Sequence, residues 1–504
     1  MPTKLPHPFF DPHAQHETKP RVLIFAFTFA ICLYLFLPLE PDLRAGITIL
    51  VLVGLLWFSE ALPLTFTSLL IPILAAITGA GELGETLSHF AHPIIFLFLG
   101  GFAMAAALSK HKLDSLIGEK IMQQARTQPI YACYMLFVMT AFLSMWISNT
   151  ATAAMMLPIA LGIAHRFGTD NASAKLFLLL GMAYSANIGG IATLIGSPPN
   201  AIAAATFHLS FMDWLKIGLP ISIILFFSMI WLLKHNIKPD LRLARPDEDD
   251  APQTAAVVQV PDPQNDKGNL VIAENATTQL SSPGISRTDL SPLAGQKFFT
   301  ADQLKVMGIF ILTVSAWILS QPLSSLLNIK ASGFDSLVAL SALVILGISG
   351  SLSWKEIERN SNWGILLLFG GGLALSEILS STGTSAYIAS GIESLLMGQP
   401  ILITLLLMTA CVVFLTEMVS NTASAALLIP LLSGVAEGLG MSPIIIGMLI
   451  AVSASCAFML PVATPPNAIV YSSSFIPQAS MIKQGFYLNM ACIVIISLSC
   501  FFLI

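Results

Sequence analysis

The stretch Ser148-Asn149-Thr150-Ala151-Thr152-Ala153-Ala154 is written a second time in this chain, almost unchanged, as Ser420-Asn421-Thr422-Ala423-Ser424-Ala425-Ala426. After the first copy comes Gly196-Ser197-Pro198-Pro199-Asn200-Ala201-Ile202. At a similar distance after the second copy comes Ala463-Thr464-Pro465-Pro466-Asn467-Ala468-Ile469. Two motifs that return in the same order at similar spacing indicate a duplicated unit.

A third pair of blocks lies upstream of these motifs. Leu-Phe-Leu-Gly-Gly occupies 97–101 and Leu-Phe-Gly-Gly-Gly occupies 368–372. Three matched blocks in one order predict that the chain consists of two copies of one unit. In a membrane chain, paired apolar segments that are interrupted by Gly or Pro point to a transporter whose binding site lies between the repeats.

The composition is that of an integral membrane protein. Of 504 residues, 55% are hydrophobic and only 10% are charged, with a mean hydropathy of +0.80, whereas soluble domains carry about 25% charged residues. Six cysteines are scattered singly through apolar runs without metal or disulfide spacing, which favours small buried side chains. The first apolar run, 22–38, has no small-residue cleavage site behind it and is interpreted as a retained helix rather than a signal peptide.

The apolar runs predict an all-α fold with about 11 transmembrane helices, since each run is near the ~20 residues that a bilayer helix needs. The runs are 22–38, 45–60, 64–81, 93–109, 173–190, 212–233, 304–324, 336–350, 363–380, 442–460 and 482–503. Two further stretches, 130–165 and 399–436, are too long for one span and carry Ser-Asn-Thr near their middle. They are predicted to be re-entrant helical hairpins, a backbone that is tolerated only where protein or a cavity surrounds it.

The basic residues predict the orientation. With the N-terminus in the cytoplasm and eleven alternating spans, 20 of the 23 Lys and Arg residues face inside, and only Arg44, Lys216 and Lys330 face outside. The C-terminus is then outside. The first hairpin opens from the cytoplasm and the second from the outside, so the two repeats are predicted to be inverted.

The expected organisation has a cytoplasmic tail, a first transmembrane helix and two repeats joined by a linker. The linker is rich in Pro, Gln, Asn, Asp, Ser and Thr, and we expect it to be cytoplasmic and mostly disordered. The segments are the tail 1–21, the first helix 22–44, repeat 1 at 45–239 (hairpin 130–165, broken helix 173–208), the linker 240–300 and repeat 2 at 301–504 (hairpin 399–436, broken helix 442–476).

The chemistry of the repeated motifs suits ions of both signs. A helix that ends at a hairpin tip leaves carbonyl oxygens unpaired, which suits a hard cation such as Na⁺, and a helix that begins there leaves N–H groups unpaired, which suits an anion. The Pro-Pro-Asn blocks break a second helix and free further carbonyls. No Arg, Lys or His lies within these blocks. An anion there would depend on hydroxyls, amides, helix ends and neighbouring cations, which is the physics of symport.

Among the acidic residues in or beside apolar runs are Glu60, Glu377 and Glu417. Intramembrane carboxylates are functional candidates by default. Glu417 directly precedes the second tip, but its counterpart in the first repeat is Met145, so an orienting hydrogen bond is the competing interpretation. The apolar runs contain no His/Asp/Cys cluster, and we expect the protein not to be an enzyme.

The chain resembles the divalent anion:sodium symporter family, specifically the bacterial INDY-type dicarboxylate transporters. The stretches 142–150 (FLSMWISNT) and 456–467 (CAFMLPVATPPN) are close to that family's signature text, and the match covers nearly all of 20–504 outside the linker. The resemblance implies a homodimer in the bacterial inner membrane. It also implies a scaffold domain formed by the outer spans of each repeat and a mobile transport domain that carries both hairpins and works by an elevator motion.

The resemblance also implies the site residues, which fall into three sets. The first Na⁺ site corresponds to Ser144, Ser148, Asn149 and Gly196. The second corresponds to Thr416, Val419, Asn421 and Ala463. The substrate site corresponds to Ser148, Asn149, Thr150, Ser197, Pro198, Ser420, Asn421, Thr422, Thr464 and Pro465.

The leading hypothesis is therefore a Na⁺-coupled importer of C4-dicarboxylates such as succinate, fumarate and malate. Its partners would be the small dicarboxylate, Na⁺, the lipid bilayer and a second copy of the chain, with no nucleic acid. A dicarboxylate exchanger and a sulfate or citrate transporter of the same family remain open. An anion channel is the alternative from a different class.

Overall fold

The computed structural model describes residues 19–113, 121, 123, 128–167, 171–241, 299–396 and 398–503. All regular structure within these residues is helical, which confirms the predicted all-α fold. Most of the N-terminal tail and of the 240–300 linker lies outside the described residues, so their predicted character stays a prediction.

The first half of the chain forms helices up to Ile237. They are α1 (Pro20–Phe36), α2 (Pro41–Ser59), α3 (Leu64–Thr78), α4 (Leu83–Ser88), η1 (His89–Ala91), α5 (Pro93–Lys110), α7 (Pro129–Ser144), α8 (Asn149–Ala164), η2 (His165–Phe167), α9 (Ala172–Ile191), α10 (Pro198–Thr206) and α11 (Phe211–Ile237).

The second half begins at Ala301. Its helices are α12 (Ala301–Ile318), α13 (Ser320–Leu326), α14 (Ala331–Ile348), α15 (Trp354–Asn360), α16 (Trp363–Ser381), α17 (Thr384–Leu396), α18 (Ile401–Thr416), α19 (Asn421–Gly438), α20 (Pro443–Ala454), α21 (Pro465–Ser472) and α22 (Gln478–Phe501).

Seven helical stretches of the described chain are long and apolar enough to cross a membrane: α2, α4 to α5, α9, α11, α12, α16 and α22. The other four predicted spans correspond to shorter apolar helices, α1, α3, α14 and α20. The arms of the two predicted hairpins, α7 with α8 and α18 with α19, are also shorter than a full span.

The predicted span 304–324 is wrong as a single helix. α12 ends at Ile318, and α13 begins at Ser320. Pro322 explains the break, because its ring clashes with the carbonyl of the residue four positions earlier, which is Ile318. The indole of Trp317 donates to the backbone oxygen of Asp335 at 3.0 Å, so the end of α12 is tied to α14.

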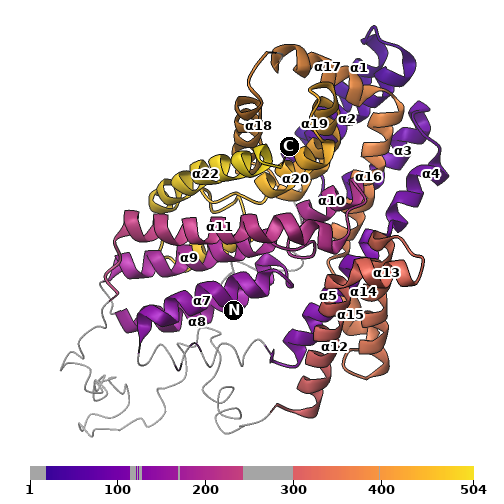
Figure 1. The fold of residues 1–504 in the computed structure, drawn as a ribbon. Coiled ribbons are helices and arrows are strands. Elements are labelled where there is room, and N and C mark those ends of the chain that lie inside the picture. Colours follow the sequence, from indigo (N-terminus) through magenta and orange to yellow (C-terminus); the bar gives the residue numbers. More distant parts are fainter. Residues whose placement is uncertain are drawn as a thin grey trace, which may run out of the picture.

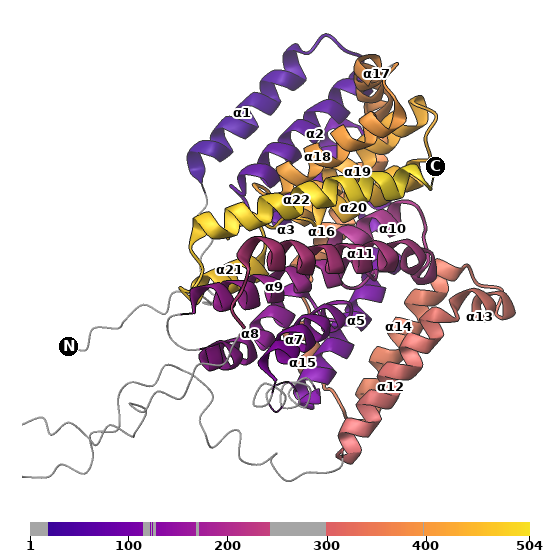
Figure 2. The ribbon, with the colours of Figure 1, turned by 60° about the vertical axis from the view of Figure 1, so that its left-hand side comes forward.

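The helices separate into two layers (Figures 1 and 2). We call α1–α5 with α12–α16 the outer layer. Within it α5 packs on α14 and α16 packs on α3. Glycines allow the close approach, since a Cβ at Gly100 would lie 2.5 Å from the backbone oxygen of Ala339, and a Cβ at Gly371 would lie 2.5 Å from the Ser68 side chain. The matched glycine blocks therefore mark places where one half of the chain packs against the other.

The second layer contains the repeated motifs, and we call α7–α11 with α18–α22 the site layer. In both views α11 lies between α9 and α22. α9 is the most enclosed of the long helices, with 94% of its apolar window buried inside the protein, against 28% for α11. Here too the halves interlock, because α8 packs on α21 and α19 packs on α10.

Candidate functional site

The two repeated motifs form tight turns between short helices. α7 ends at Ser144 and α8 begins at Asn149, while α18 ends at Thr416 and α19 begins at Asn421. Ser148 is the N-cap of α8, and its hydroxyl accepts from the backbone N–H of Ala151 at 3.3 Å. Each motif thus brings the end of one helix beside the start of the next.

Oxygen atoms converge at the first turn. The hydroxyl of Ser144 donates to the backbone oxygen of Ala186 on α9 at 2.7 Å and accepts from the Asn149 side-chain amide at 2.6 Å. The same amide nitrogen donates to Ala186 O at 3.1 Å and to Gly196 O at 3.2 Å. We call Ser144, Asn149, Ala186 and Gly196 the first clamp.

The second turn repeats this geometry. The hydroxyl of Thr416 lies 2.7 Å from Asn421 Oδ1 and 2.9 Å from the backbone oxygen of Ala454 on α20. These residues, which we call the second clamp, occupy the positions that match Ser144, Asn149 and Ala186. Hydroxyl, amide and backbone oxygens are ligands that hard cations prefer, so the donor set of both clamps fits Na⁺.

The asparagines of the Pro-Pro-Asn blocks fix the conformation of the loop at each helix break. Asn200 Nδ2 donates to Gly190 O at 2.9 Å and to Thr193 O at 2.7 Å. Asn467 Nδ2 makes the matching bonds, to Ala457 O at 3.2 Å and to Leu460 O at 3.1 Å. Both asparagines are fully buried. Each amide therefore satisfies carbonyl groups that the helix break leaves without partners.

Glu417 braces the second broken helix. Its Oε1 accepts from the N–H groups of Phe458 (2.7 Å) and Met459 (2.9 Å) and from Asn489 Nδ2 (2.7 Å), and its Oε2 accepts from Leu460 N–H (3.1 Å). Four accepted hydrogen bonds suit an ionised carboxylate. In the first repeat the Thr193 hydroxyl donates to Met145 O instead. Glu417 thus orients the loop beside the second clamp.

Two hydrogen bonds cross between the repeats close to the proposed substrate residues. Asn187 Nδ2 on α9 donates to the Thr464 hydroxyl at 3.0 Å, and the hydroxyls of Ser197 and Ser455 lie 3.0 Å apart. All four side chains are at most 3% exposed. Asn187 and Ser455 occupy matching positions of the two repeats. The sequence analysis missed them because they are different residue types, so they do not appear as a repeated motif.

Hydrogen bonds link part of each predicted ion site. Ser144, Asn149 and Gly196 meet in the first clamp, and Thr416 meets Asn421 in the second. In the described part of the chain, no hydrogen bond to a side chain joins Val419 or Ala463 to the second clamp, and Ser148 caps α8 instead. Ala186 and Ala454 were missed, since a backbone oxygen carries no sequence signal.

The predicted substrate residues lie at the contacts between the motif helices. Ser197 and Thr464 are buried. The remainder are half-buried or exposed: Ser148, Asn149, Thr150, Pro198, Ser420, Asn421, Thr422 and Pro465. Because α8 packs on α21 and α19 packs on α10, each tip faces the broken helix of the other half.

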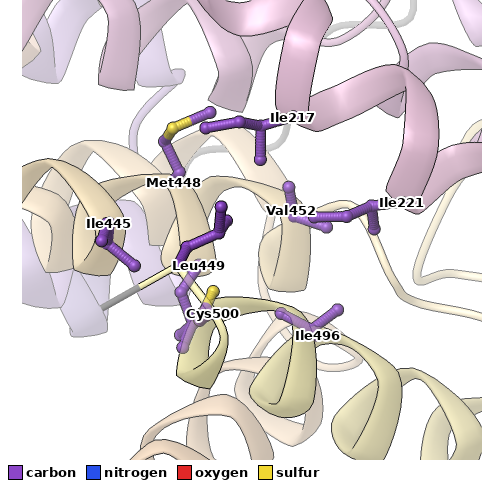
Figure 3. A pocket seen from close by; sticks show the side chains of 9 residues that line it. Ile217, Ile221, Ile445, Met448, Leu449, Val452, Ile496 and Cys500 are labelled. Carbon is purple, nitrogen blue, oxygen red and sulfur yellow. The ribbon is translucent and has the colours of Figure 1, made fainter.

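The pocket in Figure 3 lies elsewhere, between α11, α20 and α22. Its lining residues are Ile217, Ile221, Ile445, Met448, Leu449, Val452, Ile496, Cys500 and Leu503. A lining this apolar offers no hydrogen-bond donor that could hold a carboxylate. The polar turns and not this pocket are therefore the candidate site.

The fold is that of a helical protein with several stretches long and apolar enough to cross a membrane. Two solved structures share the fold: the YdaH transporter of Alcanivorax borkumensis (12% identity, TM-score 0.51, covering 83% of this chain and 87% of that one) and MtrF of Neisseria gonorrhoeae (13% identity, TM-score 0.53, covering 94% and 97%).

The sequence comparisons identify the family. The citrate transporter family, CitMHS, matches residues 54–451, and the chain belongs to it. An uncharacterized transporter of Haemophilus influenzae is 43% identical, over 92% of both chains. The sodium-dependent dicarboxylate transporter SdcS of Staphylococcus saprophyticus is 30% identical, over 89% of this chain and 83% of its own. The predictions of a transporter and not an enzyme are confirmed.

Replacing Glu417 by Gln is expected to destabilise the protein. The amide would present N–H groups to donors, and losing hydrogen bonds to a charged group costs about 1.5–3 kcal/mol. Thermal unfolding in detergent should show a lower midpoint for Glu417→Gln. Glu377→Gln is the matched control, because Glu377 is an exposed carboxylate on α16. Equal midpoints for the two variants would contradict the bracing role.

Proposed function

We propose that this protein is a sodium-coupled symporter that imports C4-dicarboxylates across the bacterial inner membrane by an elevator motion. The observation that carries the proposal is the pair of matching oxygen clamps, one at each motif, with the same hydroxyl–amide–carbonyl arrangement. The dicarboxylate name of the SdcS relatives supports the substrate class.

The proposed mechanism assigns the site residues by their chemistry. Each clamp would hold one Na⁺: Ser144, Ser148, Asn149 and Gly196 at the first, and Thr416, Val419, Asn421 and Ala463 at the second. The N-terminal ends of α8 and α19, with their free N–H groups, would face the carboxylates.

The inverted repeats and the homodimer are part of the same proposal. The paired contacts of the two halves support the repeats: each motif helix packs on the broken helix of the other half. The outer layer would serve as the scaffold, and the site layer would move. The homodimer rests on the resemblance alone.

Purified protein in proteoliposomes should take up radiolabelled succinate in a saturable, Na⁺-dependent way. A dianion entering a cell that is negative inside is opposed by about 4.6 kcal/mol per 100 mV, twice the ~2.3 per elementary charge. Using the membrane potential therefore requires a third cation beyond the two clamps. We expect faster uptake with a potassium-diffusion potential that is negative inside.

The same assay separates the alternatives. Uptake that needs internal substrate rather than external Na⁺ would establish exchange. Citrate or sulfate outcompeting succinate near neutral pH would favour those substrates, and the citrate transporter family makes citrate the stronger competitor. Current that neither saturates nor depends on Na⁺ would mean a channel.

The role of the second clamp can be tested by removing the Thr416 hydroxyl. Thr416→Val keeps the shape of the side chain but removes the hydroxyl that contacts Asn421 and Ala454. We expect the Na⁺ concentration for half-maximal uptake to rise about tenfold, the effect of roughly 1.4 kcal/mol. Thr416→Ser, which installs the residue type of position 144, should keep the wild-type value. An unchanged Na⁺ dependence in Thr416→Val would remove the clamp from the mechanism.

The proposed orientation is supported by contacts that join the end of α5 to α12 and α15. Lys110 at the end of α5 lies 2.7 Å from Glu356 on α15, and Gln303 near the start of α12 donates to His111 O. The hydrogen bonds from Lys110 and from Ser353 hold the pKa of Glu356 down at about 2, so this contact stays charged at neutral pH. All these segments are assigned to the cytoplasmic side.

Cysteine labelling tests this orientation in intact cells. Gln264→Cys in the linker should resist a membrane-impermeant maleimide until the cells are permeabilised. Lys330→Cys, assigned to the outside, should be labelled at once, and the wild-type protein supplies the background of its own cysteines. Strong labelling at 264 in sealed cells would reverse the topology.

A further inference from the structure

The Asn187–Thr464 and Ser197–Ser455 hydrogen bonds, which both cross between the repeats, are related to each other. Asn187 lies one residue after Ala186 of the first clamp, and Ser455 lies one residue after Ala454 of the second. Their partners also match, because Ser197 and Thr464 each stand directly before a Pro-Pro-Asn block. Each pair therefore joins a residue of α9, or the C-cap residue of α20, to the pre-proline position of the other repeat.

These contacts lie where a hydrogen bond has its largest effect. All four side chains are at most 3% exposed, so water cannot replace a lost partner. A buried polar group left without a partner costs more than the bond contributes when it is made. The loops that carry Ser197 and Thr464 are in addition held by the Asn200 and Asn467 amides. The two hydroxyls are thus fixed relative to their own repeat and to the other repeat.

We propose that Asn187 and Ser455 are positioning residues that set the separation of the two substrate half-sites. The inference rests on the proposed function, in which Ser197 and Thr464 contact the substrate. Each half-site hydroxyl is held by a side chain of the opposite repeat, so these two bonds act on the half-site hydroxyls themselves, within a contact that helix packing and the Tyr184 hydroxyl bond to Phe458 O also hold. The length of dicarboxylate that fits is then a property of Asn187 and Ser455, which need not touch the substrate themselves.

The consequence is a prediction about chain length rather than about overall activity. Wild-type protein should prefer the four-carbon succinate over the five-carbon glutarate. In Ser455→Ala or Asn187→Ala the half-sites can relax apart, and the KM for glutarate should fall relative to the KM for succinate. Losing one net hydrogen bond of about 0.5–1.5 kcal/mol corresponds to a change of roughly threefold to tenfold in this ratio.

Ser185→Ala is the matched control. Ser185 is also a buried serine, and its hydroxyl donates to the carbonyl four residues earlier, Gly181 O, at 2.6 Å. Ser455 makes the same kind of bond to Ala451 O at 3.2 Å, and in addition contacts Ser197. The two Ser→Ala changes remove the same atom from similar surroundings, and only one breaks a contact between repeats.

The experiment is Na⁺-driven uptake of labelled succinate and glutarate in proteoliposomes of the wild type and the three variants. The inference predicts that the KM ratio of glutarate to succinate falls about threefold to tenfold in Ser455→Ala and Asn187→Ala but not in Ser185→Ala. An unchanged ratio in Ser455→Ala, an equal fall in Ser185→Ala, or a wild type indifferent to chain length would overturn it. Absence of Na⁺-driven dicarboxylate uptake in the wild type would instead reject the proposed function.

Discussion

The site depends on one constraint: a helix that is interrupted inside a bilayer must still satisfy its backbone polar groups. Both interruptions are closed by the asparagine of the Pro-Pro-Asn block, whose amide reaches carbonyls ten and seven positions earlier in the chain. The prolines start the next helix without an N–H to satisfy. The loop in between keeps a fixed shape, and this leaves the Gly196 carbonyl free to face the first hairpin tip.

The two halves differ in the hydrogen bonds that hold the loop of the broken helix beside each hairpin tip. In the first half, a neutral hydroxyl of Thr193 links the loop to Met145 O. In the second half, the Glu417 carboxylate gathers three backbone N–H groups and the Asn489 amide. A buried carboxylate is tolerated only with such a set of donors. The second tip is therefore bound to its loop and to α22 by stronger hydrogen bonds than the first.

Much of this architecture could be predicted from the sequence, because it is written in apolar run lengths and in repeated short motifs. The turns at Ser148 and Ser420 and the breaks before Pro198 and Pro465 coincide with the motifs. The end of α12 could have been found from Pro322. The backbone oxygens of Ala186 and Ala454 could not, since any residue supplies a carbonyl and only the fold aims it. The Asn187 and Ser455 contacts escaped for a related reason: they join segments more than 250 positions apart.

In both layers, helices of one half of the chain pack on helices of the other half, and this packing limits how the molecule can move. α5 and α16 each pack on a helix of the opposite half, and so do α8 and α19. Moving one half of the chain away from the other would break contacts in both layers at once, including the buried polar pairs. A displacement of the site layer against the outer layer leaves all of these contacts intact. It has to change the packing of α16 on α10 and α19, of α2 on α19, of α5 on α10 and of α11 on α12 and α13, together with the hydrogen bond from Phe211 N–H to Asp335. Within each layer the two halves pack more extensively on each other than the layers do, which is compatible with the elevator motion that we propose.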